Sequence, residues 1–444
     1  MVWQRWTRTT ALAASCWLLA GWTFLQAQTV WTGATDNLWG TAGNWSAGLP
    51  ASGVDAVFYE VTPAAQNFAP VDLTGAVVAS RTVRALIFNS DATSPVTISG
   101  LSSTNRLSLG STQTTDLLVS AGHHIVSGAD QLTGAGDFAL AAANGANYTM
   151  NVAGNASLAF NASLTRVGGN TSVTLTKSGD GLLVFNGVNS GLSINVGTGI
   201  SVAGGTLRFA SASGSRGNSA NRVTVSADAT LELAAATYNA NNSALTLNGN
   251  GFGGVGALLG SGASSEVPSG NNAANAANAN SFLLASDSRI GVATGSTMRV
   301  TDDISGAGGL TKVGGGTLIL ESANHYDGAT NVDEGTLLIN TPSNAITKTD
   351  LVSAVFASGV TTLTFAATPG DLRVGQQVNS LPGLFLGAIP TTGLTSFVVG
   401  DASSLLPGSV TFDGITSALL KQSLNPNDTT TVNVNSGGTL GGTG

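Results

Sequence analysis

Charged side chains are scarce in this sequence of 444 residues, at 9% against roughly 25% in a typical globular protein. It also has only three histidines, four tyrosines and one cysteine. Ion pairs and a disulfide framework therefore cannot hold the fold, and metal sites built from histidine or cysteine have few candidate ligands. Long helices are not expected either, because glycine or proline interrupts nearly every window and charged pairs at helical spacing are almost absent.

The sequence is rich instead in glycine, with 59 residues, and in Thr, Ser, Asn and Ala, while 42% of its residues are hydrophobic. Disordered chains are usually charged and poor in apolar residues, so this composition argues against disorder of the whole chain. Few bulky side chains are available for a thick core, so regular hydrogen-bonded ladders must satisfy the backbone. The formal charge of −8 argues against nucleic acid or an anionic membrane surface as a partner.

The first 27 residues have the features of a secretory signal peptide. Arg5 and Arg8 precede an uncharged apolar run, 11–25, and Ala27 offers a small residue for cleavage. An uncleaved anchor helix, for which the run is somewhat short, and lipidation of Cys16 are the alternatives. Cleavage would remove the only cysteine and change the formal charge from −8 to −10. We therefore expect an exported chain without disulfides and without a transmembrane helix after cleavage.

Strands entered through glycine recur along the chain, which is typical of a repeat protein. "LTKSGDGLLVF" (175–185) aligns without a gap on "LTKVGGGTLIL" (310–320), and each is followed by a second matching piece, at 202–209 and 332–339. In each of these four segments we predict one structural glycine and one structural leucine. These residues are Gly181, Leu183, Gly205, Leu207, Gly316, Leu318, Gly335 and Leu337.

The spacing of the equivalent leucines predicts the architecture. Leu318 and Leu337 are 19 positions apart, and Leu183 and Leu207 are 24 apart. Spacings near 20 suit one turn of a solenoid whose short strands stack on the coils above and below. Alternating strands place one face in a narrow core, and glycine forms the bends without steric cost. The sequence therefore predicts an all-β solenoid.

Two regions depart from the repeat pattern. All seven tryptophans fall within the first 45 residues, and Trp31, Trp39 and Trp45 belong to the expected mature chain. They are expected either to cap the exposed first edge of the solenoid or to form a glycan-stacking site. The second region, 341–431, has strand-like segments without the repeat pattern and is interpreted as an inserted β-rich module.

These features together predict five parts of the chain. They are a signal peptide (1–27), an N-terminal cap with the first strands (28–100), a β-solenoid (101–340), the inserted module (341–431) and the start of a further, truncated repeat (432–444). An uncovered last coil is expected to fray or to pair edge to edge with another chain.

Residue patterns that carry chemistry are weak in this sequence. "GNGFGG" (249–254) fits a dinucleotide-binding pattern, but the glycine-rich segment after it does not predict the required helix, so turn glycines are favoured. His123 and His124 are adjacent and would point to opposite faces of a strand, and the same holds for Asp302 and Asp303. We therefore predict no catalytic residue, no metal site and no cofactor.

The segment "DISGAGGLTKVGGGTLILESANHYDGATNVDEGTLLIN" (303–340) resembles the autotransporter-associated β-strand repeat of secreted bacterial passenger domains. The similarity includes "GGLTK", "GGGTL", the "ANHYDGAT" turn and "GTLLIN"; Ala329 stands where close relatives usually carry glycine. Segments 174–259 and the end of the chain resemble the family less closely. The resemblance implies a right-handed parallel β-helix with no catalytic residues, displayed outside a Gram-negative-type bacterium. Autotransporters end in a membrane barrel that we do not recognise before Gly444, so a short relative exported differently, a fragment and a separately encoded secretion partner remain alternatives.

The resemblance implies a secreted or cell-surface protein with a structural or adhesive role. Extracellular glycans or other surface proteins are its expected partners. The alternative is a polysaccharide-binding or polysaccharide-lyase-like parallel β-helix, in which the stacked coils would hold an extended glycan.

Overall fold

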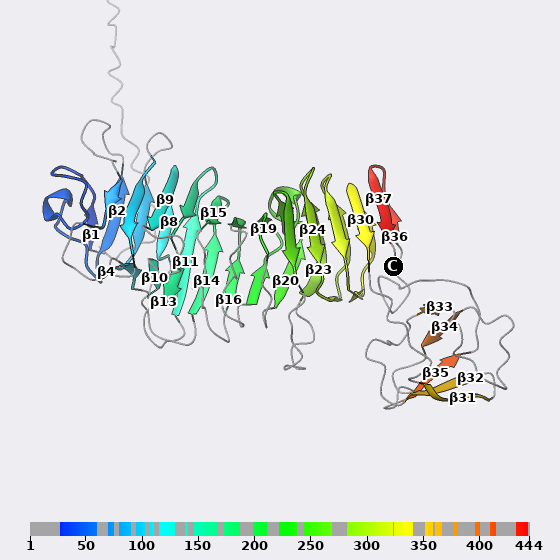
Figure 1. Cartoon of the computed structure of the whole chain (residues 1–444). Helices are drawn as coiled ribbons and strands as arrows, with labels where there is room; N and C mark the ends of the chain where they lie inside the picture. Colours follow the sequence, from blue (N-terminus) through cyan, green and yellow to red (C-terminus); the bar gives the residue numbers. More distant parts are fainter. Residues whose placement is uncertain are drawn as a thin grey trace, which may run out of the picture.

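The computed structural model is an elongated stack of β-coils (Figure 1). It describes residues 27–59, 70–74, 80–89, 95–102, 106–110, 115–128, 138–140, 146–162, 164–166, 173–186, 199–210, 222–237, 244–268, 282–322, 324–340 and 432–442, together with five strands between 351 and 413. Residues 1–26 of the predicted signal peptide lie outside the described residues. Among the residues with described structure, no helix is both long and apolar enough to cross a membrane.

Parallel strands make up the stack, and each pairs with the strand about one coil earlier and one coil later. The first coils contain β1 (Gln28–Val30), β2 (Asp55–Tyr59), β3 (Val71–Asp72), β5 (Leu86–Asn89), β6 (Thr97–Leu101), β8 (Leu117–Val119) and β9 (His123–Gly128). A separate four-stranded parallel sheet contains β4 (Ser80–Val83), β7 (Arg106–Leu109), β10 (Phe138–Leu140) and β13 (Leu164–Arg166).

The middle of the stack is formed by pairs of consecutive strands separated by glycine-containing corners. It contains β11 (Ala146–Val152), β12 (Ser157–Phe160), β14 (Val173–Ser178), β15 (Leu182–Phe185), β16 (Gly199–Val202), β17 (Gly205–Phe209), β18 (Arg222–Val225), β19 (Ala229–Ala234), β20 (Leu245–Gly249) and β21 (Leu258–Ser261). Two short 3-10 turns, η1 (Ala42–Asn44) and η2 (Phe252–Gly254), are the only helical elements among the described residues.

Later coils add a third strand. They contain β22 (Ser264–Val267), β23 (Phe282–Val292), β24 (Thr297–Val300), β25 (Ile304–Gly306), β26 (Leu310–Val313), β27 (Thr317–Leu320), β28 (His325–Tyr326), β29 (Thr330–Val332) and β30 (Gly335–Ile339). Strands β25, β26 and β27 pair with β28, β29 and β30 in the next coil. This arrangement confirms the prediction of an all-β parallel β-helix.

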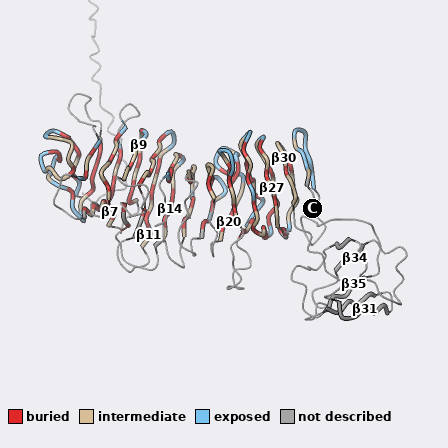
Figure 2. The backbone as a smooth tube through the Cα atoms, viewed as in Figure 1, coloured by how far each residue is buried: buried red, intermediate tan, exposed pale blue. Residues whose placement is uncertain are grey.

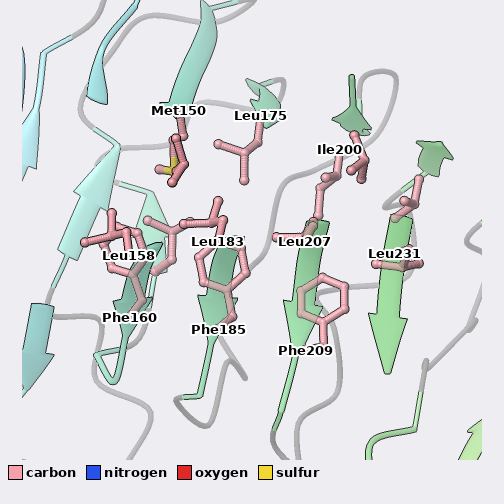
Figure 3. Packing of buried hydrophobic residues seen from close by; sticks show 14 of the residues in the cluster. Met150, Leu158, Phe160, Leu175, Leu183, Phe185, Ile200, Leu207, Phe209 and Leu231 are labelled. Carbon is pink, nitrogen blue, oxygen red and sulfur yellow. The ribbon is translucent and has the colours of Figure 1, made fainter. Parts of the chain in front are cut away.

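The core is a narrow column of apolar side chains along the stack. Leu158, Leu183, Leu207 and Leu231 occupy one register position in four successive coils and are fully buried (Figure 3). Phenylalanines form a second column, with ring centroids 5.5 Å apart between Phe160 and Phe185 and 5.9 Å between Phe185 and Phe209. Figure 2 shows the buried residues following the strands, while the exposed residues gather in bends and in the last coil.

Strands β36 (Val432–Val434) and β37 (Gly438–Gly442) form the last coil of the stack. They pair in parallel with β29 and β30, and this pairing places Leu440 beside Leu337. The chain therefore leaves the stack after Asn340 and rejoins it at Val432 in the register of the next coil.

Five strands from the region between these points form an antiparallel sheet of their own. They are β31 (Leu351–Ala357), β32 (Val360–Phe365), β33 (Gln377–Asn379), β34 (Ser396–Val399) and β35 (Ser409–Asp413), in the order β31-β32-β35-β34-β33. Antiparallel pairing distinguishes this sheet from the parallel ladder of the stack.

Candidate functional site

The predicted repeat leucines lie in the core and stack on each other. Leu183 pairs with Leu207 between β15 and β17, and Leu318 pairs with Leu337 between β27 and β30. All four are fully buried. Full burial of a leucine side chain stabilises a fold by roughly 1.5–3 kcal/mol, so this column contributes substantially to cohesion between coils.

The predicted repeat glycines lie where one coil closely approaches the next. Gly205 and Gly335 have φ values of +60° and +67°, a region that side chains with a Cβ rarely adopt. A Cβ on Gly205 would lie 2.5 Å from the carbonyl oxygens of Gly179 and Gly181 in the preceding coil. Gly181 and Gly316 lie at the entry of the second strand and are crowded in the same way by backbone carbonyls of the preceding coil.

Two buried lysines close the same corners from inside. Lys312, in β26, donates hydrogen bonds from Nζ to the carbonyl oxygens of Val313 (2.9 Å), Gly314 (2.5 Å) and Glu334 (3.1 Å). The first two acceptors belong to its own corner and the third to the corner of the next coil. Burial lowers the pKa of Lys312 to about 8, and Glu334 opposes the shift. The side chain therefore remains mainly charged at pH 7, with all three ammonium donors engaged.

Lys177, in β14, repeats this arrangement. Its Nζ donates to the carbonyl oxygens of Ser178 (3.0 Å), Gly179 (2.6 Å) and Gly204 (2.9 Å), and burial lowers its pKa to about 8. Lys177 and Lys312 occupy equivalent places in the two aligned "LTK" segments, and each lies near the end of its strand. The same contacts therefore recur in two coils.

Residues 310–339, from the first residue of β26 to the last residue of β30, match the family described as Passenger-associated-transport-repeat. This segment is similar to a passenger-associated-transport-repeat. The resemblance seen in the sequence is therefore confirmed over these residues. A search of curated proteins gave no match, and neither did a search of solved structures.

The passenger-associated-transport-repeat contains two strand pairs and the Lys312 corner between them, so the matched segment carries the coil-to-coil contacts described above. The earlier corner at Lys177 has the same hydrogen-bonding pattern outside the matched segment. Repeats of this type belong to autotransporter passenger domains. The matched segment therefore indicates a passenger-type β-solenoid.

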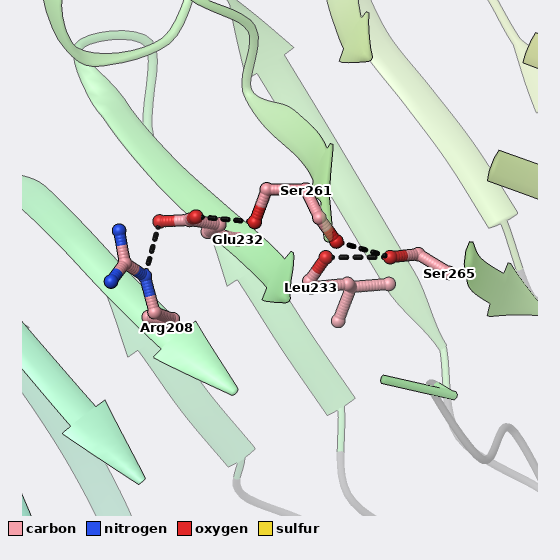
Figure 4. Close-up of polar contacts among 5 residues, drawn as sticks. All are labelled: Arg208, Glu232, Leu233, Ser261 and Ser265. Atoms are coloured by element: carbon pink, nitrogen blue, oxygen red, sulfur yellow. Dashed lines mark hydrogen bonds and ion pairs between the residues drawn. The ribbon is translucent and has the colours of Figure 1, made fainter. Parts of the chain in front are cut away.

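A polar network joins three coils beside the core (Figure 4). Glu232, which is 5% exposed, accepts hydrogen bonds from Arg208 Nε at 2.7 Å and from Ser261 Oγ at 2.6 Å. Ser265 Oγ donates to the carbonyl oxygen of Leu233 at 2.6 Å. Both carboxylate oxygens are engaged, so Glu232 connects neighbouring coils and is poorly placed to act as a general base.

The histidines do not form a metal site with each other. His124 is buried, stacks on Phe88 with ring centroids 4.7 Å apart, and accepts a hydrogen bond at Nδ1 from the backbone N–H of Val96. This bond leaves the proton on Nε2, which lies 2.7 Å from the carbonyl oxygen of Ala121. Burial lowers the pKa of His124, so it is a neutral core residue near pH 7. His123 faces outward and lies 2.8 Å from Ser157 Oγ.

Asp302 and Asp303 lie together in a turn, where Asp302 Oδ1 accepts a hydrogen bond from the backbone N–H of Asp303 at 2.9 Å. Within the described parts of the chain, no three His, Cys, Asp or Glu residues cluster closely enough to hold a metal ion. At "GNGFGG" the chain forms η2 and then strand β21, where a dinucleotide site would need a helix.

The three tryptophans pack together at the first coil. Trp31, Trp39 and Trp45 are at most 4% exposed, and the Trp45 ring lies 5.1 Å from Trp31 and 4.8 Å from Trp39 between centroids. Trp45 Nε1 donates to the carbonyl oxygen of Trp39 at 2.9 Å. A glycan can stack only on an exposed ring face, so this burial favours the cap interpretation over the glycan-stacking interpretation.

The cap loop that holds these rings is organised by Asn44, which sequence reasoning did not identify. Its side-chain oxygen accepts hydrogen bonds from the backbone N–H groups of Thr35 (2.8 Å) and Asp36 (3.0 Å). Its Nδ2 donates to Asp36 Oδ1 and to the carbonyl oxygen of Leu38. A "TDN" segment followed by "GN" indicates turns in general, but it does not specify which polar groups pair.

Proposed function

We propose that the chain is a non-enzymatic exported β-helix that acts as a rigid support at the bacterial cell surface. In this role the coils carry the inserted module, residues 341–431, toward extracellular partners. The passenger-associated-transport-repeat and the signal-peptide-like start support export. The main support for a structural or adhesive role is that the insert lies, in the sequence, between two coils that pair with each other.

The observation that carries the proposal is the continuity of the ladder across the insert. Thr330 pairs with Val432 and Leu337 with Leu440, although 341–431 lie between them in the chain. The insert therefore leaves the order of stacked coils unchanged. A segment inserted between two stacked coils in this way is suited to contact other molecules, as loops on rigid scaffolds commonly do.

The experiment compares the full chain with a variant in which 341–431 are replaced by a ten-residue Gly/Ser linker. Both proteins are screened on an array of plant and algal glycans and on intact bacterial cells. We expect equal β-sheet content by far-UV circular dichroism, and loss of binding only in the shortened variant. If the shortened variant still bound, the binding surface would lie on the coils and the proposed role of the insert would be wrong.

The same screen tests the polysaccharide-lyase-like alternative. Reducing-end and unsaturated-product assays are run on every glycan that binds. Product formation by the full chain would replace the non-enzymatic proposal. The variant Glu232→Gln would then show whether the buried carboxylate of the network in Figure 4 takes part.

Edge-to-edge self-association is a second property that we propose. Val432, Val434 and Leu440 of the last coil are 38–47% exposed although they continue the core columns of the coil beneath. No described strand pairs with the outer edge of β36 or β37. Light scattering over a concentration series should show dimers in the full chain, and Leu440→Asp should abolish them.

A further inference from the structure

A cavity of about 300 Å³ lies at the N-terminal end of the stack, between the tryptophan cap and strand β4. Figure 1 shows β4 beside the first coils. Trp39, Leu49, Pro50 and Ala51 contribute apolar lining, and Arg81 and Thr82 contribute polar groups from β4. Leu49 is 44% exposed and stands at the rim, whereas Arg81 is 7% exposed. The cavity is therefore open to solvent on the cap side, and Arg81 forms part of its wall.

Arg81 occupies a position that is apolar in the neighbouring coils. It pairs with Leu107 in β7, which pairs with Phe138 in β10, which in turn pairs with Leu164 in β13. All three partners are buried. The core-facing column of this sheet thus ends, at the first strand, in an arginine rather than in another apolar side chain.

The hydrogen-bonding capacity of Arg81 is only partly used. Its Nη1 donates to the carbonyl oxygen of Leu73 at 3.3 Å, while Nη2 is buried and has no hydrogen-bond partner among the described residues. Asp72 is the nearby acid that offsets the charge, but its carboxylate accepts hydrogen bonds from the backbone N–H and the hydroxyl of Thr74. A buried donor without a partner is costly, more so on a charged group.

We propose that this cavity binds a small carboxylic acid with an apolar body, whose carboxylate accepts hydrogen bonds from Arg81. A carboxylate matches the planar fork of a guanidinium and forms charge-assisted hydrogen bonds with it. The apolar body then contacts Leu49 and Ala51, the exposed apolar residues of the lining, in place of water. At roughly 30 Å³ for each water molecule in the liquid, the cavity has room for about ten non-hydrogen atoms, close to the size of benzoate.

The lining also excludes other anions. Inorganic phosphate or sulfate would leave the apolar wall unused, and a sugar acid would place most of its hydroxyl groups against Leu49, Pro50 and Ala51, because Ser52 and Thr82 are the hydroxyl side chains of the lining. The cavity is thus a binding site independent of the inserted module, and its occupant is expected to be an amphiphilic organic acid.

The test is fluorine NMR of 4-fluorobenzoate titrated with the purified full chain in a carboxylate-free buffer of low salt. We expect line broadening that fits a Kd on the order of 1 mM, as is usual for a ligand of this size. Uncharged fluorobenzene and sodium galacturonate are titrated in parallel, and both should bind at least tenfold more weakly. Equal binding of fluorobenzene, or tighter binding of galacturonate, would overturn the proposal.

The decisive variant is Arg81→Met, which should weaken 4-fluorobenzoate binding at least tenfold. Arg106→Met is the matched control: Arg106 lies in the next coil, pairs with Ser80 and also has a buried nitrogen without a partner, but it does not line the cavity. It should leave binding unchanged. Undiminished binding by Arg81→Met would refute the assignment.

A second pair of variants keeps the test independent of how Arg81→Met folds. Leu49→Glu places a carboxylate at the exposed rim, where it repels an anionic ligand, and Leu49→Gln has a similar shape without the charge. We expect at least threefold weaker binding for Leu49→Glu than for Leu49→Gln. Equal affinities of the two variants would place the 4-fluorobenzoate site elsewhere.

Discussion

Replacing Gly335 by alanine tests the close approach between coils that the fold requires. The backbone at Gly335 has a φ of +67°, and a Cβ there would meet the carbonyl oxygens of Gly314 and Gly316 in the coil beneath. Both oxygens belong to a corner that is held by Lys312 and by the parallel ladder. The corner can therefore move aside only by weakening those hydrogen bonds.

The magnitude follows from two separable effects. An alanine at positive φ costs about 1 kcal/mol, at the lower end of the left-handed penalty. Overpacking against fixed atoms adds roughly 1–3 kcal/mol. Gly335→Ala should therefore lower the free energy of unfolding by about 2–4 kcal/mol.

Two control variants separate these effects. Gly295 has a φ of +79° but nothing within 4 Å of an added Cβ, so Gly295→Ala should cost only about 1 kcal/mol. Gly316 is outside the positive-φ set but is crowded by the carbonyls of Ala293 and Ser296, so Gly316→Ala measures crowding alone, at roughly 1–3 kcal/mol.

The assay is urea unfolding followed by far-UV circular dichroism, with hydrogen exchange of the segment 310–339 to locate the loss of stability. Tryptophan fluorescence serves as an internal control, because the tryptophans of the coil stack lie in the N-terminal cap. If Gly335→Ala and Gly295→Ala destabilised the protein equally, coil-to-coil crowding would not be the reason for glycine at this corner.

Three further predictions concern the same stack. Leu337→Ala should lower the free energy of unfolding in urea by roughly 2–5 kcal/mol, and Leu338→Ala by less than about 1 kcal/mol, because only Leu337 is fully buried. Equal losses of stability in the two variants would contradict the strand register. The pKa of Lys177 and Lys312 is about 8 in the fold against about 10.4 in an unfolded chain, so the unfolded state binds more protons between these values. The free energy of unfolding should therefore rise as the pH is raised from 7.5 to 9.5. A variant with both lysines changed to Met should show a flatter dependence of the urea midpoint on pH. Replacing 341–431 by a short linker should leave the hydrogen-exchange protection of β29 and β30 unchanged, and loss of protection there would show that the insert supports the stack.

The architecture could be predicted from the sequence because the spacing of the repeated segments is enough to indicate a solenoid. The "LTK" and "GTL" segments recur about one coil apart, and alternation decides which side chains enter the core, so the pairing of Leu318 with Leu337 could be anticipated. The position of the last coil could be anticipated in the same way, since its "GGTL" resembles the earlier strands.

Other features depend on contacts between distant segments and were not accessible in this way. The sequence shows three tryptophans in the expected mature chain but not that their rings pack on each other and on Phe58, the observation that favours a cap over a glycan site. Arg81 offers no signal at all, because its neighbours in the cavity come from cap segments about 30 to 40 residues earlier in the chain. Side-chain hydrogen bonds to single carbonyls have no sequence pattern of their own.

The return of the chain to the ladder after 341–431 has an entropic consequence. Closing a loop of about 90 residues costs only about 2 kcal/mol more than closing one of ten, since the cost grows with the logarithm of length. The contacts of a single coil can offset a penalty of that size. A fold of this kind can therefore acquire whole modules at its bends during evolution. Each inserted module would lower mainly the stability of the coil that follows it.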